Sequence, residues 1–409
     1  MKKFRDLRKD ELVKGSLVLF IMMNLYNFLN YIYQISMVRM LGAARYGVFA
    51  VLMSVVYIFT VPNEAIQTAL SRITSRFNPK NEFGKMKFIF YKALKKSMKF
   101  SLICFVLFIP LGFFLAYFLP DVTFLHLLFT GIILFGVFSI PVTRGILQGR
   151  KKFKKLGLNM IIEAMMKVGF AIGFVFIGLG VYGAISAVIL SIFISFIISL
   201  FFMGEVIKSK KKKTKTDNMT SYSKPILGAI FVIIIMMSID IILAKRFFPA
   251  ELAGKYAVVS MLGKIIFFGT YAVGKAMFPI ASENYEGGKD SSQVFRMSMK
   301  IVVGLSILAL ILYLFFPKLI IKVLFGAEYM DASNIVFIVG LGFSFLSVSN
   351  LSILYCLSIN KIKRASVMVI FIIFEIILMS YFNATLMQFS LAFLAVNFLM
   401  LVYSLSLLK

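Results

Sequence analysis

The stretch YGAISAVILSIFISFIISLFFMG occupies residues 182–204 and contains no Asp, Glu, Lys or Arg. A hydrocarbon core about 30 Å thick needs about 20 apolar residues of helix to cross it, so this stretch predicts a membrane-spanning helix. Comparable apolar runs occur along the rest of the chain. The twelve predicted spans are 15–37, 47–69, 98–119, 123–143, 156–178, 182–204, 225–246, 254–279, 298–317, 332–356, 366–382 and 387–408.

The composition supports the same class of protein. The residues AVILMFWYC make up 60% of the 409 residues and charged residues only 15%, whereas charged residues are about a quarter of a soluble domain. Soluble enzymes are therefore excluded, and we expect an all-α polytopic membrane protein. The two cysteines, Cys104 and Cys356, and the single His126 cannot supply a zinc site or a disulfide framework, so we expect no metal and no cofactor.

The basic residues predict the orientation of the chain. Forty-five Lys and Arg residues against 17 Asp and Glu residues give a net charge of +28. Loops that stay in the cytoplasm carry the excess of positive charge. With the N-terminus inside, 35 basic residues, including Arg144 and Arg150, fall in cytoplasmic segments, and seven, including Lys245, fall in outer loops. We therefore predict a multi-pass protein of the cytoplasmic membrane with both termini inside, whose charge complements anionic headgroups rather than nucleic acid.

An internal repeat predicts two bundles. Tyr46-Gly-Val-Phe opens the second span, and Tyr256-Ala-Val-Val opens the eighth span after a comparable polar loop. Six spans in each half make the repeat parallel, and paired bundles of this kind with a cleft between them are typical of transporters. The predicted organisation is an N-terminal six-helix bundle at 1–204, a flexible basic cytoplasmic linker at 205–224 and a C-terminal six-helix bundle at 225–409.

Polar side chains within the predicted spans are the first candidates for a binding site. Four amides of the first span recur every three or four residues and form one stripe on the helix. Hydrogen bonding between helices and the lining of a substrate cavity are both open interpretations of this stripe. The four residues are Asn24, Asn27, Asn30 and Gln34.

Charged residues in the spans are expensive in lipid and are therefore functional candidates. Lys264, Tyr271 and Lys275 lie on one face of the eighth span, where two lysines and an aromatic ring would suit an anionic phosphate with an attached sugar. Lys275 could instead extend to the cytoplasmic surface. Asp240 lies at a depth similar to that of Lys264, so an Asp240–Lys264 pair is expected. This pair could be structural or could break during transport.

Acidic residues in the spans are candidates for ion coupling. Glu163 and Lys167 are four residues apart, and we expect them to neutralise each other along their helix. Glu375 has no such neighbour in the eleventh span, so it is the best candidate to carry a proton or to bind Na⁺. Glu64, beside Pro62, marks either a broken helix at the cavity or a polar contact between helices.

Several motifs resemble one known family. The segment from Ser36 to Gly47, SMVRMLGAARYG, resembles the aRxLGxxxYG signature of polysaccharide transporters, which are flippases of lipid-linked oligosaccharides within the multidrug/oligosaccharidyl-lipid/polysaccharide exporter superfamily. The resemblance continues over nearly the whole chain. Further matching motifs begin at Arg144 (RGILQG), Asp240 (DIILAK), Glu251 (ELAGKYA), Phe278 (FP) and Phe316 (FPKLIIKVLFGAEY).

The resemblance implies a flippase that moves a polyprenyl-(pyro)phosphate-linked oligosaccharide across the membrane for surface polysaccharide or glycoprotein synthesis. Cationic residues in a central cavity are a feature of such flippases, and Arg39, Arg72, Lys264 and Lys275 are the positions that could fill this role. A multidrug or small-molecule antiporter on the same fold is the nearest alternative. A membrane polymerase or ligase is a weaker one, because such enzymes need a sizeable outer loop, and a scaffold without transport would need no buried charge.

Overall fold

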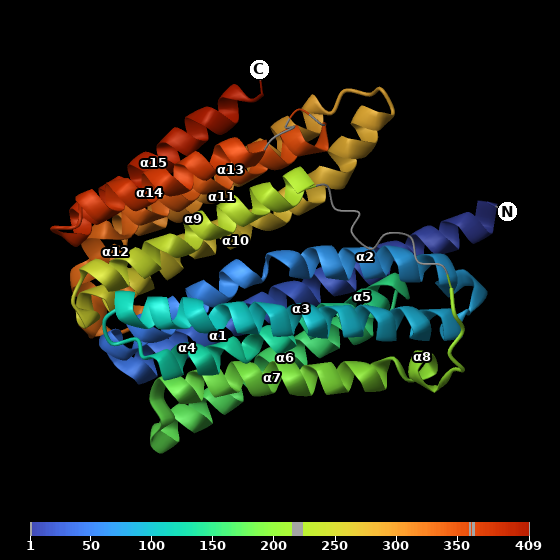
Figure 1. The fold of residues 1–409 in the computed structure, drawn as a ribbon. Helices are drawn as coiled ribbons and strands as arrows, with labels where there is room; N and C mark the ends of the chain where they lie inside the picture. The colour runs from blue at the N-terminus through green and yellow to red at the C-terminus, as the bar shows by residue number, and fades with distance from the viewer. Residues whose placement is uncertain (1, 215–223, 360, 362–364, 409) are drawn as a thin grey trace. The chain divides into compact units, whose positions relative to one another are not determined.

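The structure, a computed structural model, describes residues 2–214, 224–359, 361 and 365–408 (Figure 1). Its described residues form helices and short connections and contain no β-strand, as expected for the predicted all-α class. The α-helices are α1 (Lys2–Phe59), α2 (Val61–Phe77), α3 (Phe83–Phe118), α4 (Phe124–Gly131), α5 (Ile133–Gly149), α6 (Phe153–Phe174), α7 (Gly180–Phe202), α8 (Gly204–Lys208), α9 (Lys224–Phe247), α10 (Ala250–Glu286), α11 (Ser292–Phe315), α12 (Pro317–Leu324), α13 (Val336–Ser358), α14 (Val369–Tyr381) and α15 (Leu386–Ser406). A π-helical turn, η2 (Val175–Leu179), and the 3₁₀ helices η1 (Asn78–Lys80), η3 (Ala327–Ile335) and η4 (Ala365–Met368) complete the described elements.

The apolar helices agree with the predicted spans. Nine helical stretches in the described part of the chain are long and apolar enough to cross a membrane. Two of them, Ile21–Phe59 and Phe153–Phe202, contain the non-helical glycines Gly42 and Gly178. Dividing these two stretches at their glycines and adding the shorter apolar helix Val369–Tyr381 gives twelve apolar segments in the predicted order. The chain is a multi-pass, all-α membrane protein.

Two breaks affect the second span: one lies just before it, at Gly42, and the other lies within it, at Thr60. Gly42 has φ 72° and ψ 168°, a left-handed conformation that glycine adopts without the steric cost of a Cβ atom. Thr60 separates α1 from α2, and Pro62 follows in the first turn of α2, where its missing N–H group costs no helical hydrogen bond. The predicted span at 47–69 is therefore built from the end of α1 and the first half of α2.

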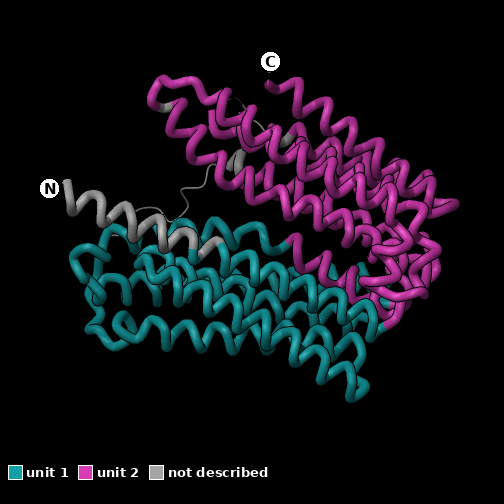
Figure 2. Tube along the Cα trace, turned by 180° about the vertical axis from the view of Figure 1, so that it is seen from behind, with its two compact units in different colours: residues 1–41, 59–118, 122–221 teal, residues 42–58, 119–121, 222–409 magenta. Residues whose placement is uncertain are grey.

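The chain divides into two compact units (Figure 2). Unit 1 comprises residues 1–41, 59–118 and 122–221, and unit 2 comprises residues 42–58, 119–121 and 222–409. The units differ from the predicted domains because two short segments of the first half of the chain cluster with unit 2. The breaks at Gly42 and Thr60 lie at or beside the ends of the longer of these segments.

In unit 1, two glycines allow α2 and α5 to approach closely. A Cβ atom at Gly145 would lie 2.7 Å from the carbonyl oxygen of Gln67, and one at Gly149 would lie 2.4 Å from that of Ser71. The two helices also share a hydrogen bond of 2.9 Å from Gln67 Nε2 to Gln148 Oε1. The RGILQG motif therefore supplies the surface of α5 against which α2 packs.

In unit 2, the end of α1 packs against the start of α10. A Cβ atom at Gly254 would lie 1.8 Å from the carbonyl oxygen of Ala43, and one at Gly47 would lie 3.1 Å from the backbone nitrogen of Gly254. Glu328 Oε1 accepts a hydrogen bond of 3.1 Å from the backbone N–H of Ala43, just after the break at Gly42. This carboxylate caps the amino-terminal end of the second span. Three separate sequence motifs thus meet at one packing contact.

The predicted linker is partly folded. Its first residues form α8, and the backbone N–H of Lys212 donates a hydrogen bond of 3.0 Å to the carbonyl oxygen of Gly84 in α3. The expectation of a flexible connector is therefore wrong for residues 205–212, because backbone pairing holds them on α3. Residues 215–223 of the linker lie outside the described part of the chain.

Candidate functional site

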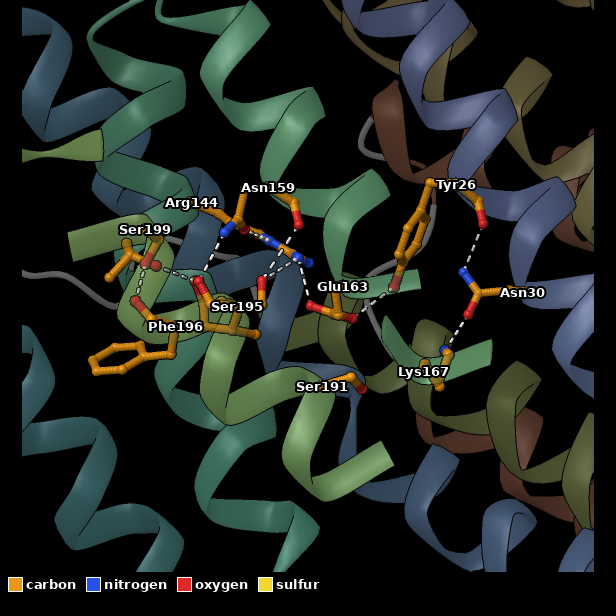
Figure 3. Close-up of polar contacts among 12 residues, drawn as sticks. Tyr26, Asn30, Arg144, Asn159, Glu163, Lys167, Ser191, Ser195, Phe196 and Ser199 are labelled. Atoms are coloured by element: carbon orange, nitrogen blue, oxygen red, sulfur yellow. Dashed lines mark hydrogen bonds and ion pairs between the residues drawn. The ribbon is translucent and has the colours of Figure 1, made fainter. Parts of the chain in front are cut away.

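Unit 1 contains a buried ion pair (Figure 3). Arg144 in α5 and Glu163 in α6 are both buried, and their charged atoms are 2.6 Å apart. A buried carboxylate needs a close cation and further hydrogen bonds to offset the loss of its hydration. Arg144 was counted among the cytoplasmic loop charges, and that assignment is wrong because its side chain lies inside the bundle.

Amide and hydroxyl groups from two helices complete the coordination of Arg144 (Figure 3). Its Nε donates a hydrogen bond of 3.0 Å to Asn159 Oδ1, and its Nη2 lies 3.5 Å from Ser195 Oγ. The amide of Asn159 in turn donates to the carbonyl oxygen of Ser195 in α7 at 2.7 Å. The guanidinium therefore joins α5, α6 and α7 through groups that are themselves hydrogen-bonded, which makes the arrangement rigid.

The same network continues to α1. Tyr26 donates a hydrogen bond of 3.2 Å to Glu163 Oε1, and Asn30 donates one of 2.8 Å to the carbonyl oxygen of Tyr26. Lys167 donates to Asn30 Oδ1, and its ammonium lies 5.1 Å from the centre of the Tyr33 ring. The expected mutual neutralisation of Glu163 and Lys167 is wrong, because Arg144 pairs with Glu163 while Lys167 turns toward α1.

The predicted amide stripe of α1 does not act as one unit. Asn30 enters the buried network and is partly buried, as is Gln34, whereas Asn24 and Asn27 are exposed on the surface of unit 1. Hydrogen bonding between helices, one of the two interpretations of the stripe, therefore applies to Asn30, and the lining of a substrate cavity stays a prediction. Two further polar residues, Glu64 and Arg72, are exposed two turns apart on α2, and Arg39 is exposed near the end of the first span.

Unit 2 contains a second buried cluster. Asp240 in α9 is fully buried, and its Oδ2 accepts a hydrogen bond of 2.5 Å from Ser260 Oγ in α10. Lys264, one turn further along α10, places its ammonium 3.9 Å from Asp240 Oδ1. The structure therefore brings together the two charges that the sequence predicts as a pair.

Glu375 in α14 belongs to the same cluster. Its carboxylate is fully buried, and no described group donates a hydrogen bond to either of its oxygens. Glu375 interacts electrostatically with both Asp240 and Lys264. The buried Tyr256 hydroxyl is also within electrostatic reach of both carboxylates. When all three charged groups of the cluster are ionised, two carboxylates share one ammonium and leave a buried charge of −1.

The three residues of α10 that were predicted to form one anion site do not all lie together. Lys264 belongs to the buried cluster, whereas Lys275 is exposed and holds its ammonium 4.7 Å from the centre of the Tyr271 ring. Tyr271 also stacks on Phe267, with ring centres 5.8 Å apart. Only Tyr271 and Lys275 therefore remain together as a candidate anion site, and Lys264 is not part of it.

Two further lysines of unit 2 are engaged in ion pairs. Lys245, counted in sequence as a charge in an outer loop, is 1% exposed and lies 2.7 Å from Asp121. Lys255 bridges Glu251 at 2.8 Å and Asp331 at 3.1 Å. The described residues contain no group of three or more His, Cys, Asp or Glu side chains that could hold a metal ion.

Comparison with known families identifies the chain. Residues 36–334 match the family of polysaccharide biosynthesis proteins, and this range covers more than half of the 409 residues. The chain belongs to this family. No curated protein sequence matches it. The match includes the SMVRMLG, RGILQG and FGAEY segments, which here form the breaks and packing surfaces of the second span.

Solved structures with a similar fold cover nearly all of this polysaccharide biosynthesis family protein. An inward-facing multidrug resistance MATE family transporter of the MOP superfamily has a TM-score of 0.72 at 13% identity, covering 96% of this chain and 97% of its own. A eukaryotic MATE transporter has a TM-score of 0.70 at 15% identity, covering 98% and 95%. A MOP superfamily transporter from Pyrococcus furiosus has a TM-score of 0.62 at 15% identity, covering 97% and 94%. At these identities the likeness establishes the fold, and the family match establishes membership of the polysaccharide biosynthesis family.

Sequence reasoning missed several members of the two clusters in this family protein. Asn159, Ser195 and Ser260 are common polar residues, and nothing in their local sequence separates them from polar residues that face lipid or solvent. Arg144 was visible only as part of a basic run. One signal was its position in the RGILQG motif, six residues before the basic residues resume at Arg150 and after a long apolar run.

Proposed function

We propose that this polysaccharide biosynthesis family protein is a flippase for a polyprenyl-(pyro)phosphate-linked oligosaccharide. It would move this lipid across the cytoplasmic membrane by alternating access, for surface polysaccharide or glycoprotein assembly. Family membership supports a role in polysaccharide synthesis, and the transporter fold supports movement of a substrate rather than its chemical conversion. The predicted orientation, with both termini in the cytoplasm, is part of this proposal.

The pairing of Lys275 with Tyr271 carries the choice of substrate class. An exposed ammonium beside an aromatic ring on an apolar helix offers charge to a phosphate and a flat surface to a sugar. An exposed lysine in this setting is costly if it faces lipid. The headgroup of a lipid-linked oligosaccharide combines an anionic phosphate with sugars, and its lipid tail can remain in the bilayer during transfer.

The buried cluster of unit 2 is the proposed site of ion coupling. Its net charge of −1, with Asp240, Lys264 and Glu375 ionised, would be neutralised by one proton or one Na⁺ ion. Neutralising a buried charge changes its interaction with the surrounding helices, which is how an ion gradient can bias two conformations. Glu375, whose oxygens accept no hydrogen bond from any described group, is the proposed acceptor.

A multidrug or small-molecule cation antiporter is the second candidate. The observation that favours it is the fold, which this chain shares with multidrug resistance transporters. Such a protein would bind organic cations, whereas the lysine at Tyr271 would repel them. The positive charge of Lys275 therefore favours the flippase over the cation antiporter.

Leaflet exchange in proteoliposomes tests the proposal. The purified protein is reconstituted with a fluorescent polyprenyl-pyrophosphate oligosaccharide, and protein-dependent exchange is measured for the wild type, for Lys275→Met and for the exposed control Lys154→Met. We expect exchange by the wild type, at least a tenfold loss for Lys275→Met and no change for Lys154→Met. Absence of exchange together with ion flux driven by cationic drugs would assign the protein to the antiporters. Exchange that is unchanged in Lys275→Met would reject the assigned site.

A further inference from the structure

Helix α3 carries a basic and apolar face on the outside of unit 1. Tyr91, Lys95 and Lys99 are exposed and recur every four residues, so they lie on one side of the helix. Leu102 and Val106, both 54% exposed, continue the same face, about 5 Å and about 10 Å beyond Lys99 along the axis. Cationic side chains thus lead directly into an apolar surface that faces outward from unit 1.

Residues 207–212, here called the basic strap, add another cation to this face. Lys211 places its ammonium 5.5 Å from the centre of the Tyr91 ring and 5.7 Å from that of Phe88. Because Tyr91 precedes Lys95 by one helical turn, the ammonium of Lys211 is held at the start of the Lys95–Lys99 row. The charge brought by Lys211 therefore belongs to the surface of α3.

Three contacts hold the strap in this position. The ammonium of Lys87 donates hydrogen bonds to the carbonyl oxygens of Ile207 at 2.6 Å and Ser209 at 3.0 Å. The backbone of Lys212 pairs with Gly84, where a Cβ atom would lie 2.3 Å from the carbonyl oxygen of Lys210. Only glycine allows this approach, so the strap is fitted to the first turn of α3.

The lysines of this face lack carboxylate partners among the described residues. Two acids near this end of unit 1, both within the described part of the chain, are engaged elsewhere, since Glu82 pairs with Lys85 at 2.8 Å and Glu205 pairs with Arg150. Arg150 also lowers the pKa of Glu205, which keeps that carboxylate ionised and paired at neutral pH. Like charges one helical turn apart repel each other, so Lys95, Lys99 and Lys211 are favourable neighbours only when an anion lies between them.

We propose that this face, made of Tyr91, Lys95, Lys99 and Lys211, binds the phosphate headgroup of an anionic phospholipid. The phosphate lies among the three ammonium groups, and the acyl chains follow the exposed side chains of Leu102 and Val106. The continuous apolar surface below the cations selects a lipid over a soluble phosphate. The end of α3 concerned is predicted to be cytoplasmic, so the lipid belongs to the inner leaflet. This proposal does not depend on the transported substrate.

Native mass spectrometry of the full-length protein in detergent tests the inference. The protein is titrated with phosphatidylglycerol and, separately, with phosphatidylcholine, and the bound fraction is counted. We expect a preference for phosphatidylglycerol that falls about tenfold in K95Q/K99Q, because each lysine near an anionic headgroup contributes substantially to binding. The matched control K318Q/K322Q removes two exposed lysines with the same spacing from α12 and should leave the preference unchanged.

Three results would overturn the inference: equal binding of the two lipids by the wild type, an equal loss in K318Q/K322Q, or displacement of phosphatidylglycerol by millimolar inorganic phosphate. The last result would indicate a simple anion site. Thermal unfolding of each variant without added lipid shows whether it is folded. Lys211→Gln provides a second variant outside the helix, for which we expect a smaller loss of the same sign.

Discussion

Glu375 has a fully buried carboxylate to which no described group donates a hydrogen bond. Burying a charged group costs more than burying a neutral polar group of the same shape. We therefore expect Glu375→Gln, which keeps the shape of the side chain and cannot ionise, to raise the free energy of unfolding by about 1 kcal/mol at a pH at which the wild-type carboxyl group is ionised. Thermal unfolding in detergent measures the change, and Glu283→Gln, an exposed control in the same unit, should show none. A clear loss of stability in Glu375→Gln would contradict the description of an unsupported charge.

Removing the charge of Arg144 should have the opposite effect on stability, because it leaves Glu163 buried without a cation. Breaking a buried ion pair from one side costs about 3–5 kcal/mol. Arg144→Met should therefore be strongly destabilising, and adding Glu163→Gln should recover part of the loss. A double-mutant cycle followed by thermal unfolding measures the coupling energy. If Lys167→Met were as destabilising as Arg144→Met and showed the same coupling energy with Glu163, Lys167 rather than Arg144 would be the main partner of Glu163.

The charged clusters were predictable to different degrees. Asp240 and Lys264 could be paired from depth alone, because two isolated charges at one level of a bilayer have few alternatives. The partner of Glu163 could not, because spacing along one helix identifies Lys167 and carries no information about α5. Glu375 could be recognised as isolated on its own helix, but its place beside Asp240 depends on how α9, α10 and α14 pack.

At the scale of helices, glycine determines where two of them can touch. Gly254 lies against the backbone of Ala43, whereas Gly269, on the same helix, has no atom within 4 Å of an added Cβ. Overpacking a close contact costs about 1–3 kcal/mol. We expect Gly254→Ala to destabilise unit 2 by about this amount, and Gly269→Ala to be neutral or to stabilise by up to about 1 kcal/mol through helix propensity. Thermal unfolding of the two variants compares the sites directly, and equal effects would reject the close approach of α1 and α10.

The helices themselves were largely predictable, because each apolar run long enough to cross the bilayer forms a helix there. Their interruptions were less so. The break at Thr60 follows from Pro62 only once the packing of α2 on α5 is known, since the same proline could have continued a kinked helix. The strap on α3 was unpredictable for a related reason: a lysine-rich segment has no local signal for docking, and its partner, Gly84, lies more than a hundred residues away.

For the whole molecule, the orientation in the membrane is the main prediction that sequence alone supports. Both natural cysteines are buried, so single cysteines placed on the surface should dominate labelling. Lys318→Cys should react with a membrane-impermeant maleimide in intact cells, because α12 is predicted to lie outside. Lys154→Cys should react only after the cells are permeabilised. The reverse pattern would invert the topology, and labelling of the wild type serves as the background control.

Gly42 also bears on how the chain enters the membrane during synthesis. Only the short segment 38–46, which contains Arg39 and Arg45, separates the first two predicted spans, so the translocon has little hydrophilic chain to pass across between them. We therefore expect the first span to be released into lipid together with the second. Biogenesis of this protein would then begin with a two-helix unit, half of which later packs with helices that have not yet been translated.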